Sequence, residues 1–304
     1  MVVHSTCKTP ARASDGSAKK NTPRPRARRE SNGQIRRYAH LGTGNYNPST
    51  ARFYTDLSLL TTDAHITASV HHVFNYLTAY SERASYSPLF VAPLNLGKSC
   101  LTLINREAKH ARAGRPAFIF AKVNALLDER IIEALYRASQ AGVQIELVVR
   151  GACALRPGLR GISSRIRVRS VIGRFLEHSR VFVFGNGGKA ETYLGSADWM
   201  HRNIYERVEV MYHLRDPELA HQVFAEVLQP YLADTAKARF LLSDGKYIRS
   251  REATKLLHMR NGFAFNAQEF LIGVAEGRDN LQSVPSAERP FKAAGLVAAS
   301  SKSV

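Results

Sequence analysis

Residues 89–231 alternate between predicted strands and predicted helices, and this order constrains the fold more than any other feature of the chain. Short apolar runs, typical of buried strands, are separated by longer segments whose apolar residues recur at helical spacing. The expected strands are residues 89–92, 117–121, 143–149, 166–172, 180–185, 192–195 and 207–213, and the expected helices are residues 98–113, 127–141 and a third that begins at Asp216-Pro217. The pattern predicts an α/β fold, a sandwich with a mixed β-sheet flanked by helices.

A shorter unit is predicted in front of this one. Arg37–Leu41 is typical of a strand, and it ends in the turn Gly42–Asn47. Thr62-Asp63 then begins a helix whose apolar residues recur at helical spacing. Ser87-Pro88 indicates a boundary between the two units.

The two ends of the chain lack this regularity. Residues 1–33 are rich in Lys, Arg and Pro and show no hydrophobic periodicity, so we expect a disordered basic segment. A tail that grips polyanions is the functional alternative. Beyond about Gly245 the pattern weakens, and residues 250–304 are expected to be a partly disordered extension in which Asn266–Ile272 forms one helical turn or more.

The formal net charge of +18 indicates a polyanionic partner. Nucleic acid, an acidic membrane surface and a phosphate polymer all fit, and charge does not choose among them. The three cysteines are too few and too widely spaced for a disulfide framework or a zinc site, so a reducing cytoplasmic compartment is the default. No apolar run approaches the roughly 20 residues that a membrane-spanning helix needs, and no secretory-type apolar segment follows the basic N-terminus.

His178 is the first candidate for chemistry, because histidine can move a proton or carry a phosphoryl group near neutral pH. It lies in the segment Arg174–Arg180, directly before an apolar strand, with Arg180 two residues on and Asp198 after a following strand. A structural histidine at the mouth of a strand is the alternative. The combination of imidazole, guanidinium and carboxylate favours a catalytic role.

Arginines are concentrated around this segment. A guanidinium group presents a planar fork that suits phosphate oxygens. The arginines of this group are Arg150, Arg156, Arg160, Arg165, Arg167, Arg169, Arg174, Arg180, Arg202 and Arg207. A solvated basic face is the alternative, but their number beside His178 favours phosphate binding.

Two predicted strands end in similar turns of small residues. Tyr38–Asn45 matches Thr192–Asp198, since in both a strand opens into a glycine-containing turn that ends in Asn or Asp. Glycine and serine let the backbone approach a ligand closely. Two unrelated strand exits are the alternative.

These motifs resemble those of the phospholipase D superfamily, whose halves each carry H-x-K and then a glycine–serine/threonine–x–Asn turn. The chain more closely resembles the C-terminal half of bacterial polyphosphate kinases, from about Arg36 to about Arg249. The motifs that carry this resemblance are Tyr38–Asn47, Thr50–Arg52, Tyr54–Asp56, Val149–Gly151, Ile166–Ser170, Phe175–Arg180, Gly185–Gly188 and Gly195–Met200.

The resemblance implies a phospholipase D-like sandwich with one complete domain plus part of a second. Residues 34–86 would be the remnant of the first catalytic domain, and residues 87–249 the second. It also implies reversible transfer of the terminal phosphate of ATP to polyphosphate, with Mg²⁺ and through a phosphohistidine. ATP or ADP and polyphosphate would be the ligands of a bacterial cytoplasmic homo-oligomer, without a specific nucleic acid partner and with peripheral association with acidic surfaces as an option.

Matching motifs also imply roles for individual residues. Tyr54, Arg150 and His178 resemble residues that contact the nucleotide. His178 would in addition be the catalytic histidine of the second half, which donates a proton or stabilises charge at the transferring phosphate. The other assignments, none of them to a metal ligand, are active-site lining for Asp198 and Arg207, phosphate binding for Arg180, and a place near the site for His40.

One motif of the family is missing. The phosphorylated histidine belongs to an H-x-K strand before the first turn, but the corresponding step back from Gly42 reaches Pro25, in a stretch without histidine. We therefore expect an N-terminally truncated chain whose residues 1–33 do not match the family and whose phosphoryl transfer is impaired. A non-enzymatic polyphosphate-binding or polyanion-binding module is the alternative function. A phospholipase D-type phosphodiesterase is a weaker one, because the chain offers a single H-x-R motif.

Overall fold

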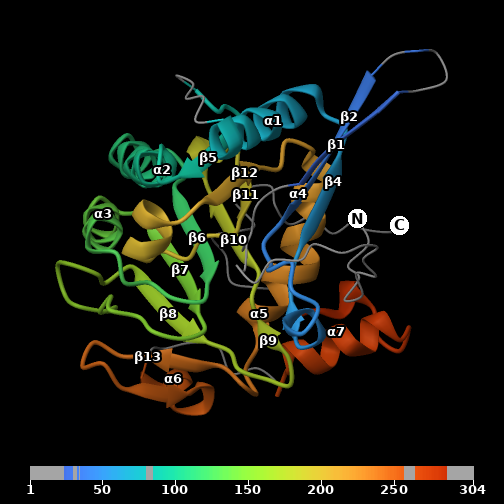
Figure 1. The fold of residues 1–304 in the computed structure, drawn as a ribbon. Coiled ribbons are helices and arrows are strands. Elements are labelled where there is room, and N and C mark those ends of the chain that lie inside the picture. Colours follow the sequence, from blue (N-terminus) through green and yellow to red (C-terminus); the bar gives the residue numbers. More distant parts are fainter. Residues whose placement is uncertain (1–23, 30–32, 34, 80–84, 257–263, 286–304) are drawn as a thin grey trace, which may run out of the picture.

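The computed structural model describes residues 24–29, 33, 35–79, 85–256 and 264–285 (Figure 1). Its centre is a nine-stranded sheet in the order β14-β13-β8-β7-β6-β10-β11-β12-β5. The pairs β6–β7 and β7–β8 are parallel, and the other pairs are antiparallel. The strands span β5 Leu89–Ala92, β6 Phe118–Val123, β7 Gln144–Val149, β8 Ile166–Ser170, β10 Arg180–Phe184, β11 Glu191–Gly195, β12 Glu209–His213, β13 Arg239–Leu241 and β14 Tyr247–Arg249.

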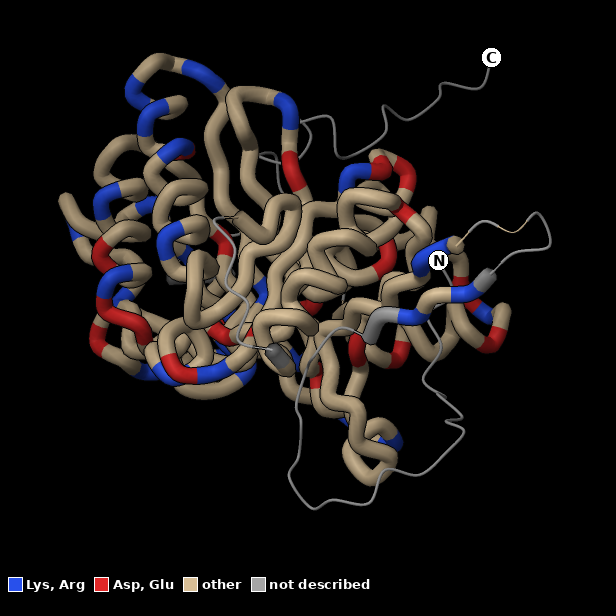
Figure 2. Tube along the Cα trace, turned by 45° about the horizontal axis from the view of Figure 1, so that its top comes forward, with Lys and Arg blue, Asp and Glu red and all other residues tan. Residues whose placement is uncertain are grey.

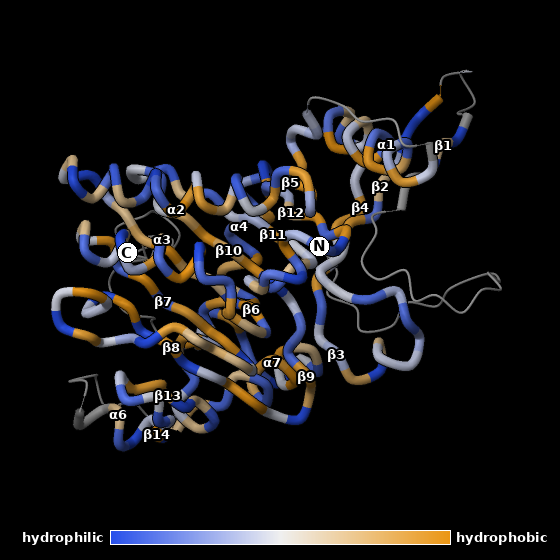
Figure 3. The backbone as a smooth tube through the Cα atoms, turned by 60° about the vertical axis from the view of Figure 1, so that its left-hand side comes forward, coloured by the Kyte–Doolittle hydropathy of each residue, from blue (hydrophilic) through white to orange (hydrophobic). Residues whose placement is uncertain are grey.

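Helices cover both faces of this sheet, and apolar residues are concentrated on its strands (Figure 3). Helices α2 (Leu96–Arg112) and α3 (Glu129–Gln140) pack on one face. Helices α1 (Ala64–Ala79) and α4 (Pro217–Val223) pack on the other, together with the π-helical turns Phe224–Leu228 that lead into α5 (Gln229–Ala233). The predicted fold class, a mixed sheet flanked by helices, is confirmed.

Strand β6 shows how the sequence divides between the two layers. Successive side chains of a strand point to opposite faces. Ile119 and Ala121 therefore join the core beneath α2 and α3, whereas Phe118 and Phe120 join the core beneath α1 and α4. All six residues of β6 are buried, as expected for a strand covered on both sides.

The helix starts follow from capping residues. The Asp216 side chain accepts hydrogen bonds from the backbone N–H groups of Glu218 and Leu219, so α4 begins at Pro217 as predicted. Asp63 caps α1 in the same way, with its Oδ1 atom 2.8 Å from the backbone N of Ile66. No helix within the described ranges is both long and apolar enough to cross a bilayer.

A three-stranded sheet stands beside the main one and corrects one expectation. Strand β1 (Arg24–Arg29) pairs antiparallel with β2 (Ile35–Gly42), which pairs with β4 (Ser58–Thr61). The basic segment expected to be disordered through residue 33 therefore includes a strand. Its order comes from backbone pairing rather than from burial, because Arg26–Arg28 stay exposed, and hydrophobic periodicity could not reveal it. Residues 1–23 of that segment lie outside the described residues.

A two-residue strand connects this region to the main domain. After the 3₁₀ turn Thr50–Arg52, strand β3 (Tyr54–Thr55) pairs in parallel with β9 (Leu176–Glu177). The backbone O of Thr55 accepts hydrogen bonds from the backbone N–H groups of both His178 and Ser179, each at 3.1 Å. The pairing places residues 54–56 directly against the segment that the sequence singles out.

The C-terminal part is more ordered than the sequence suggests. It contains β13, β14, α6 (Ser250–Leu256), α7 (Ala267–Ala275) and the 3₁₀ turn Leu281–Ser283. The predicted turn of helix at Asn266 is confirmed, and Asn266 caps it through the backbone N–H of Glu269. Residues 257–263 and 286–304 of the extension expected to be partly disordered lie outside the described residues. Helix α7 contacts α5 and shares a small apolar core with Tyr231 and Phe240.

Candidate active site around His178

His178 lies at the junction of β9 and β10 and is 7% exposed. Its Nδ1 atom is 3.1 Å and 3.0 Å from the two carboxylate oxygens of Asp56. The ring of Tyr54 lies against the imidazole, with 4.7 Å between ring centroids. Strand β3 therefore supplies both a carboxylate partner and an aromatic wall for this histidine.

Arg180 joins His178 to Asp198. Its Nε and Nη2 atoms donate to the two carboxylate oxygens of Asp198, at 3.2 Å and 2.8 Å, in the forked geometry that guanidinium groups favour. Its Nη1 atom donates to the backbone O of Thr43 at 2.9 Å and lies 3.0 Å from both ring nitrogens of His178. Arg180 itself is 5% exposed, so this cation is held in a site largely closed to water.

The two small-residue turns meet at this arginine. Asp198 comes from the turn after β11 and accepts a hydrogen bond from the backbone N of Asn124 at 2.6 Å. Thr43 comes from the turn after β2, and its Oγ1 atom donates to Asp56 at 2.8 Å. The two turns that are similar in sequence therefore also lie next to each other, on either side of Arg180. Gly44 has no room for a side chain, since a Cβ atom there would lie 2.2 Å from the Asp56 carboxylate.

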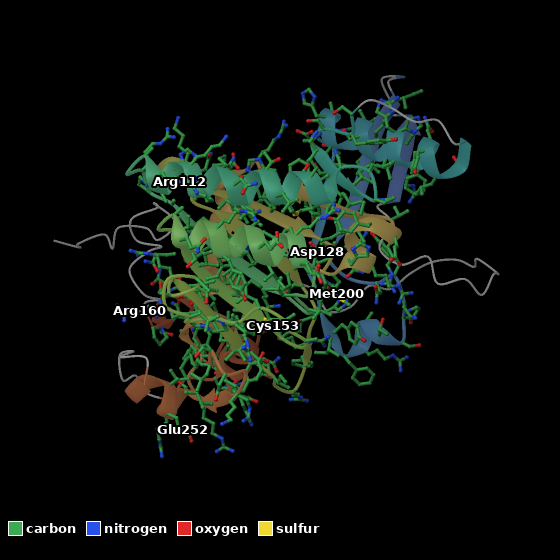
Figure 4. All side chains as sticks on the ribbon, turned by 90° about the vertical axis from the view of Figure 1, so that its left-hand side faces the viewer. Arg112, Asp128, Cys153, Arg160, Met200 and Glu252 are labelled. Atoms are coloured by element: carbon green, nitrogen blue, oxygen red, sulfur yellow. The ribbon has the colours of Figure 1, made fainter. Side chains whose placement is uncertain are left out.

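The connection after β11 is fixed to the start of α3. The backbone N–H groups of Leu127 and Asp128 both donate to the backbone O of Trp199, at 2.8 Å and 3.0 Å. Figure 4 shows Asp128 and Met200 at the same end of the main sheet. These bonds hold the turn that carries Asp198 in place beside Asn124.

Electrostatics keep the histidine neutral and the aspartate ionised. Burial lowers the pKa of His178 below its usual range, although the hydrogen bond that the ring donates to the Asp56 carboxylate opposes the shift. Burial alone would raise the pKa of Asp198, but the charge and hydrogen bonds of Arg180 outweigh it and lower that pKa. Near neutral pH the site therefore holds an uncharged imidazole beside an ionised Arg180–Asp198 pair.

Arg150 extends the basic wall at the end of β7. Burial lowers the pKa of its guanidinium, and the neighbouring carboxylate of Asp198 opposes the shift. The same group interacts electrostatically with Arg180 and Tyr54. Figure 2 shows Lys and Arg spread along the described trace with Asp and Glu between them, so the basic residues are not gathered in one segment.

Five of the seven residues singled out from the sequence thus come together: Tyr54, Arg150, His178, Arg180 and Asp198. His40 lies on β2, where its Nδ1 atom is 2.8 Å from the hydroxyl of Tyr46. Arg207 follows the π-helical turn Arg202–Glu206.

Similarity to known families agrees with this geometry. The family described as polyphosphate kinase C-terminal domain 2 matches residues 89–260, and the family described as polyphosphate kinase C-terminal domain 1 matches residues 26–83. The first match alone covers more than half of the chain. The chain belongs to the polyphosphate kinase family.

Individual polyphosphate kinases show the extent of the match. The Pseudomonas aeruginosa enzyme is 52% identical over 221 residues, which are 73% of this chain and 32% of that protein. The Synechocystis enzyme is 48% identical over 240 residues, 79% of this chain and 33% of that protein. The crystal structure of the Porphyromonas gingivalis polyphosphate kinase superposes with a TM-score of 0.73 at 36% identity, covering 80% of this chain and 36% of that one. The chain thus spans about one third of the length of the curated polyphosphate kinases that it matches.

The polyphosphate kinase match starts inside β1, at residue 26, so the expectation that residues 1–33 do not match the family is wrong for residues 26–33. The structure also adds residues that the sequence reasoning missed. Asp56 stood in the motif Tyr54–Asp56 but received no role, because nothing in the sequence connects it to a histidine 122 positions away. Glu177 flanks His178 in the sequence, but its ion pair with Lys122, at 3.3 Å, was not predicted because these two residues are far apart in the chain.

Proposed function

We propose that this chain forms part of the phosphoryl-transfer site of a polyphosphate kinase, which moves the terminal phosphate of ATP reversibly onto polyphosphate. The observation that carries the proposal is the buried, neutral His178, held between Asp56 and the Arg180–Asp198 pair. Phosphoryl transfer depends mainly on positioning the phosphate and on cations that hold its developing charge. A closed site lined by arginine and histidine provides both.

We assign His178 the role of proton donor or charge stabiliser at the transferring phosphate. Asp56 faces Nδ1 and, as an acceptor, favours the tautomer that carries its proton there. A phosphate oxygen that enters the site brings negative charge, which raises the pKa of the imidazole and favours its protonated form. Asp56 therefore sets the tautomer of the imidazole, and the negative charge of the bound substrate favours its protonation.

The remaining assignments concern substrate contacts. We propose that Tyr54 and Arg150 contact the nucleotide, in keeping with their place around His178. Arg180 would orient a phosphate while Asp198 holds its guanidinium group in place. On family resemblance, we propose that Arg207 lines the active site and that His40 lies near it.

The phosphohistidine of the family is assigned to no residue here. We expect this 304-residue polypeptide not to form a covalent phosphohistidine by itself, because no H-x-K strand precedes the turn Gly42–Asn47. Incubation of the purified chain with γ-labelled ATP, followed by a search for alkali-stable label, tests this point. Stable labelling would contradict it.

Mg²⁺ belongs to the proposal only through the substrate. The described residues contain no group of three or more His, Cys, Asp or Glu side chains placed to hold a metal ion. Mg²⁺ usually binds through one or two carboxylates together with substrate phosphates. No step proposed for His178, Arg180 or Asp56 passes through the ion.

We also propose a bacterial cytoplasmic setting, with homo-oligomers and with peripheral association with acidic surfaces. The charge of +18 supports a polyanionic ligand such as polyphosphate. Binding to such a ligand should weaken as salt rises, because salt screens charges over about 10 Å at 0.1 M. Binding that salt does not affect would speak against the electrostatic basis of the proposal.

ATP formation from ADP and polyphosphate tests the proposed activity. We expect ATP formation by this chain to be slow, because no H-x-K strand precedes the turn Gly42–Asn47, and His178→Ala to lower the rate further by about 10²–10⁴-fold. His65→Ala, at an exposed position on α1, is the matched control. Polyphosphate binding without any ATP formation would favour the non-enzymatic module instead, and cleavage of a phosphodiester would favour the phosphodiesterase.

A further inference from the structure

Gln268, in the first turn of α7, forms hydrogen bonds with the strand that directly precedes His178. The side chain is buried, with 4% of the residue exposed. Its Oε1 atom accepts a hydrogen bond from the backbone N of Phe175 at 3.0 Å, and its Nε2 atom donates to the backbone O of the same residue at 3.0 Å. Nε2 also donates to Oε1 of Glu177 at 2.7 Å. One amide thus fixes both the backbone and a side chain of residues 175–177.

Glu177 links Gln268 to the segments that bear His178 and Asp56. Its Oε2 atom accepts a hydrogen bond from Thr55 Oγ1 at 2.9 Å and lies 3.3 Å from Lys122 Nζ. Glu177 directly precedes His178 in the chain, and Thr55 directly precedes Asp56. The carboxylate therefore joins the two backbone segments whose next residues form the imidazole–carboxylate pair.

Helix α7 is anchored independently of that strand. Asp234 is 1% exposed, and its Oδ2 atom accepts a hydrogen bond from the backbone N of Ala267 at 2.8 Å. Its Oδ1 atom accepts two more, from the backbone N–H groups of Lys237 and Ala238. The start of α7, which carries Gln268, is thus held in place by Asp234.

The chain also keeps space for this amide. A Cβ atom on Gly173 would lie 2.2 Å from Oε1 of Gln268. Beside the amide is a cavity of about 340 Å³, lined among others by Asp56, Glu177 and Ser179 on one side and by Leu271 and Val274 of α7 on the other. The hydrogen bonds from Gln268 therefore hold the strand before His178 at the edge of this cavity.

We propose that Gln268 is a positioning residue of the His178 site, which holds residues 175–177 so that the imidazole meets Asp56 and Tyr54. Gln268 lies beyond residues 89–260, the range matched by polyphosphate kinase C-terminal domain 2. Its role in phosphoryl transfer rests on the proposed function. The placement of the ring does not, and it can be measured without turnover.

The first test is the histidine NMR spectrum of the full chain. In Gln268→Ala we expect the His178 ring to lose burial, so that its titration midpoint rises toward the usual range and the ring-current shift from Tyr54 shrinks. Gln282→Ala, an exposed glutamine on the following 3₁₀ turn, should leave both unchanged.

The second variant keeps the volume of the side chain. Gln268→Glu places a second carboxylate beside Glu177, which repels it, and like charges at this distance raise one of the two pKa values. Protonation restores a donor, so the His178 signals of this variant should return toward those of the wild type as the pH falls from 8 to 6. A role in packing alone would give no such recovery.

Turnover separates this inference from the proposed function. If the chain forms ATP, Gln268→Ala should lower kcat by about 10- to 100-fold with little change in KM for polyphosphate, as for a displaced catalytic group. If neither the wild type nor any variant forms ATP, the proposed function fails. The NMR test still decides whether Gln268 positions the His178 ring. Unchanged His178 signals in whichever Gln268 variant keeps the wild-type circular dichroism spectrum would overturn the inference.

Discussion

The carboxylate of Asp56 lies 3.0 Å from Nδ1 of His178, although 122 residues separate the two in the chain. The distance is set by the pairing of β3 with β9, in which Tyr54 faces Leu176 and Thr55 faces Glu177. The chemistry proposed for His178 therefore depends on a segment outside the main domain.

Asp56→Asn should make His178 harder to protonate. The carboxylate raises the pKa of His178 against the effect of burial, so its loss should move the titration midpoint further below the usual range. We expect ATP formation to fall by about 10–10³-fold, since a general acid loses its orienting partner. Asp244→Asn, at an exposed carboxylate, is the control. A raised midpoint in Asp56→Asn would contradict the assignment.

Arg180→Lys should show that the fork matters as well as the charge. Lysine cannot make the two parallel bonds to Asp198, and it leaves a buried carboxylate partly unpaired. We expect a loss of about 1–3 kcal/mol in the free energy of unfolding, measured with urea. Arg278→Lys changes an exposed pair with Glu276 and should have little effect. Equal stability of the two variants would argue against a structural role for the fork.

Gly44→Ala should disturb the site through its shape. The added methyl group would lie 2.2 Å from Asp56 Oδ2, so the carboxylate or the turn must move. We expect the Asp56–His178 contact to weaken and ATP formation to fall by about 10-fold or more. Gly42→Ala is the matched control, because its Cβ atom would meet nothing closer than 3.6 Å. Wild-type activity in Gly44→Ala would mean that the turn adapts.

Acid should destabilise the fold in two steps. The pKa of His178 is lower in the folded than in the unfolded chain, so the unfolded state takes up its proton first and stability falls as the pH drops below about 6.5. Asp198 also has a lowered folded pKa, and its contribution is lost as the pH falls through about 3.9 and below. Urea unfolding of the wild type and His178→Gln at pH 8, 5 and 3 separates the two. The first step should be smaller in His178→Gln, and an unchanged step would assign it to other groups.

Local signals were enough to predict seven of the nine strands of the main sheet, all but β13 and β14, and half of the site. Strand β6 begins with the apolar run Phe118–Ala121 and β7 ends with Leu147–Val149, and Asp216 and Asn266 are capping residues, so their elements could be placed from neighbours in the chain. His178 and Arg180 are two residues apart where β10 begins, and Asp198 follows the adjacent strand. Proximity in sequence and in the sheet therefore predicted this trio.

The other half depends on contacts that leave no local pattern. Strand β1 is basic and exposed, and its order comes from pairing with β2. Strand β3 has only two residues, too few for any periodicity, and Gln268 looks like an ordinary polar residue of a short helix. The importance of β3 and Gln268 arises from partners 91 to 122 residues away.

The short β3–β9 pairing divides the candidate site around His178 into two parts. Tyr54 and Asp56 are attached to the same two-residue strand, so any hinge motion that parts β3 from β9 would withdraw the aromatic wall and the carboxylate in one step. His178, Arg180 and Asp198 would stay behind on the rigid sheet. The site would then be either fully assembled or without both residues, depending on the few backbone hydrogen bonds between β3 and β9.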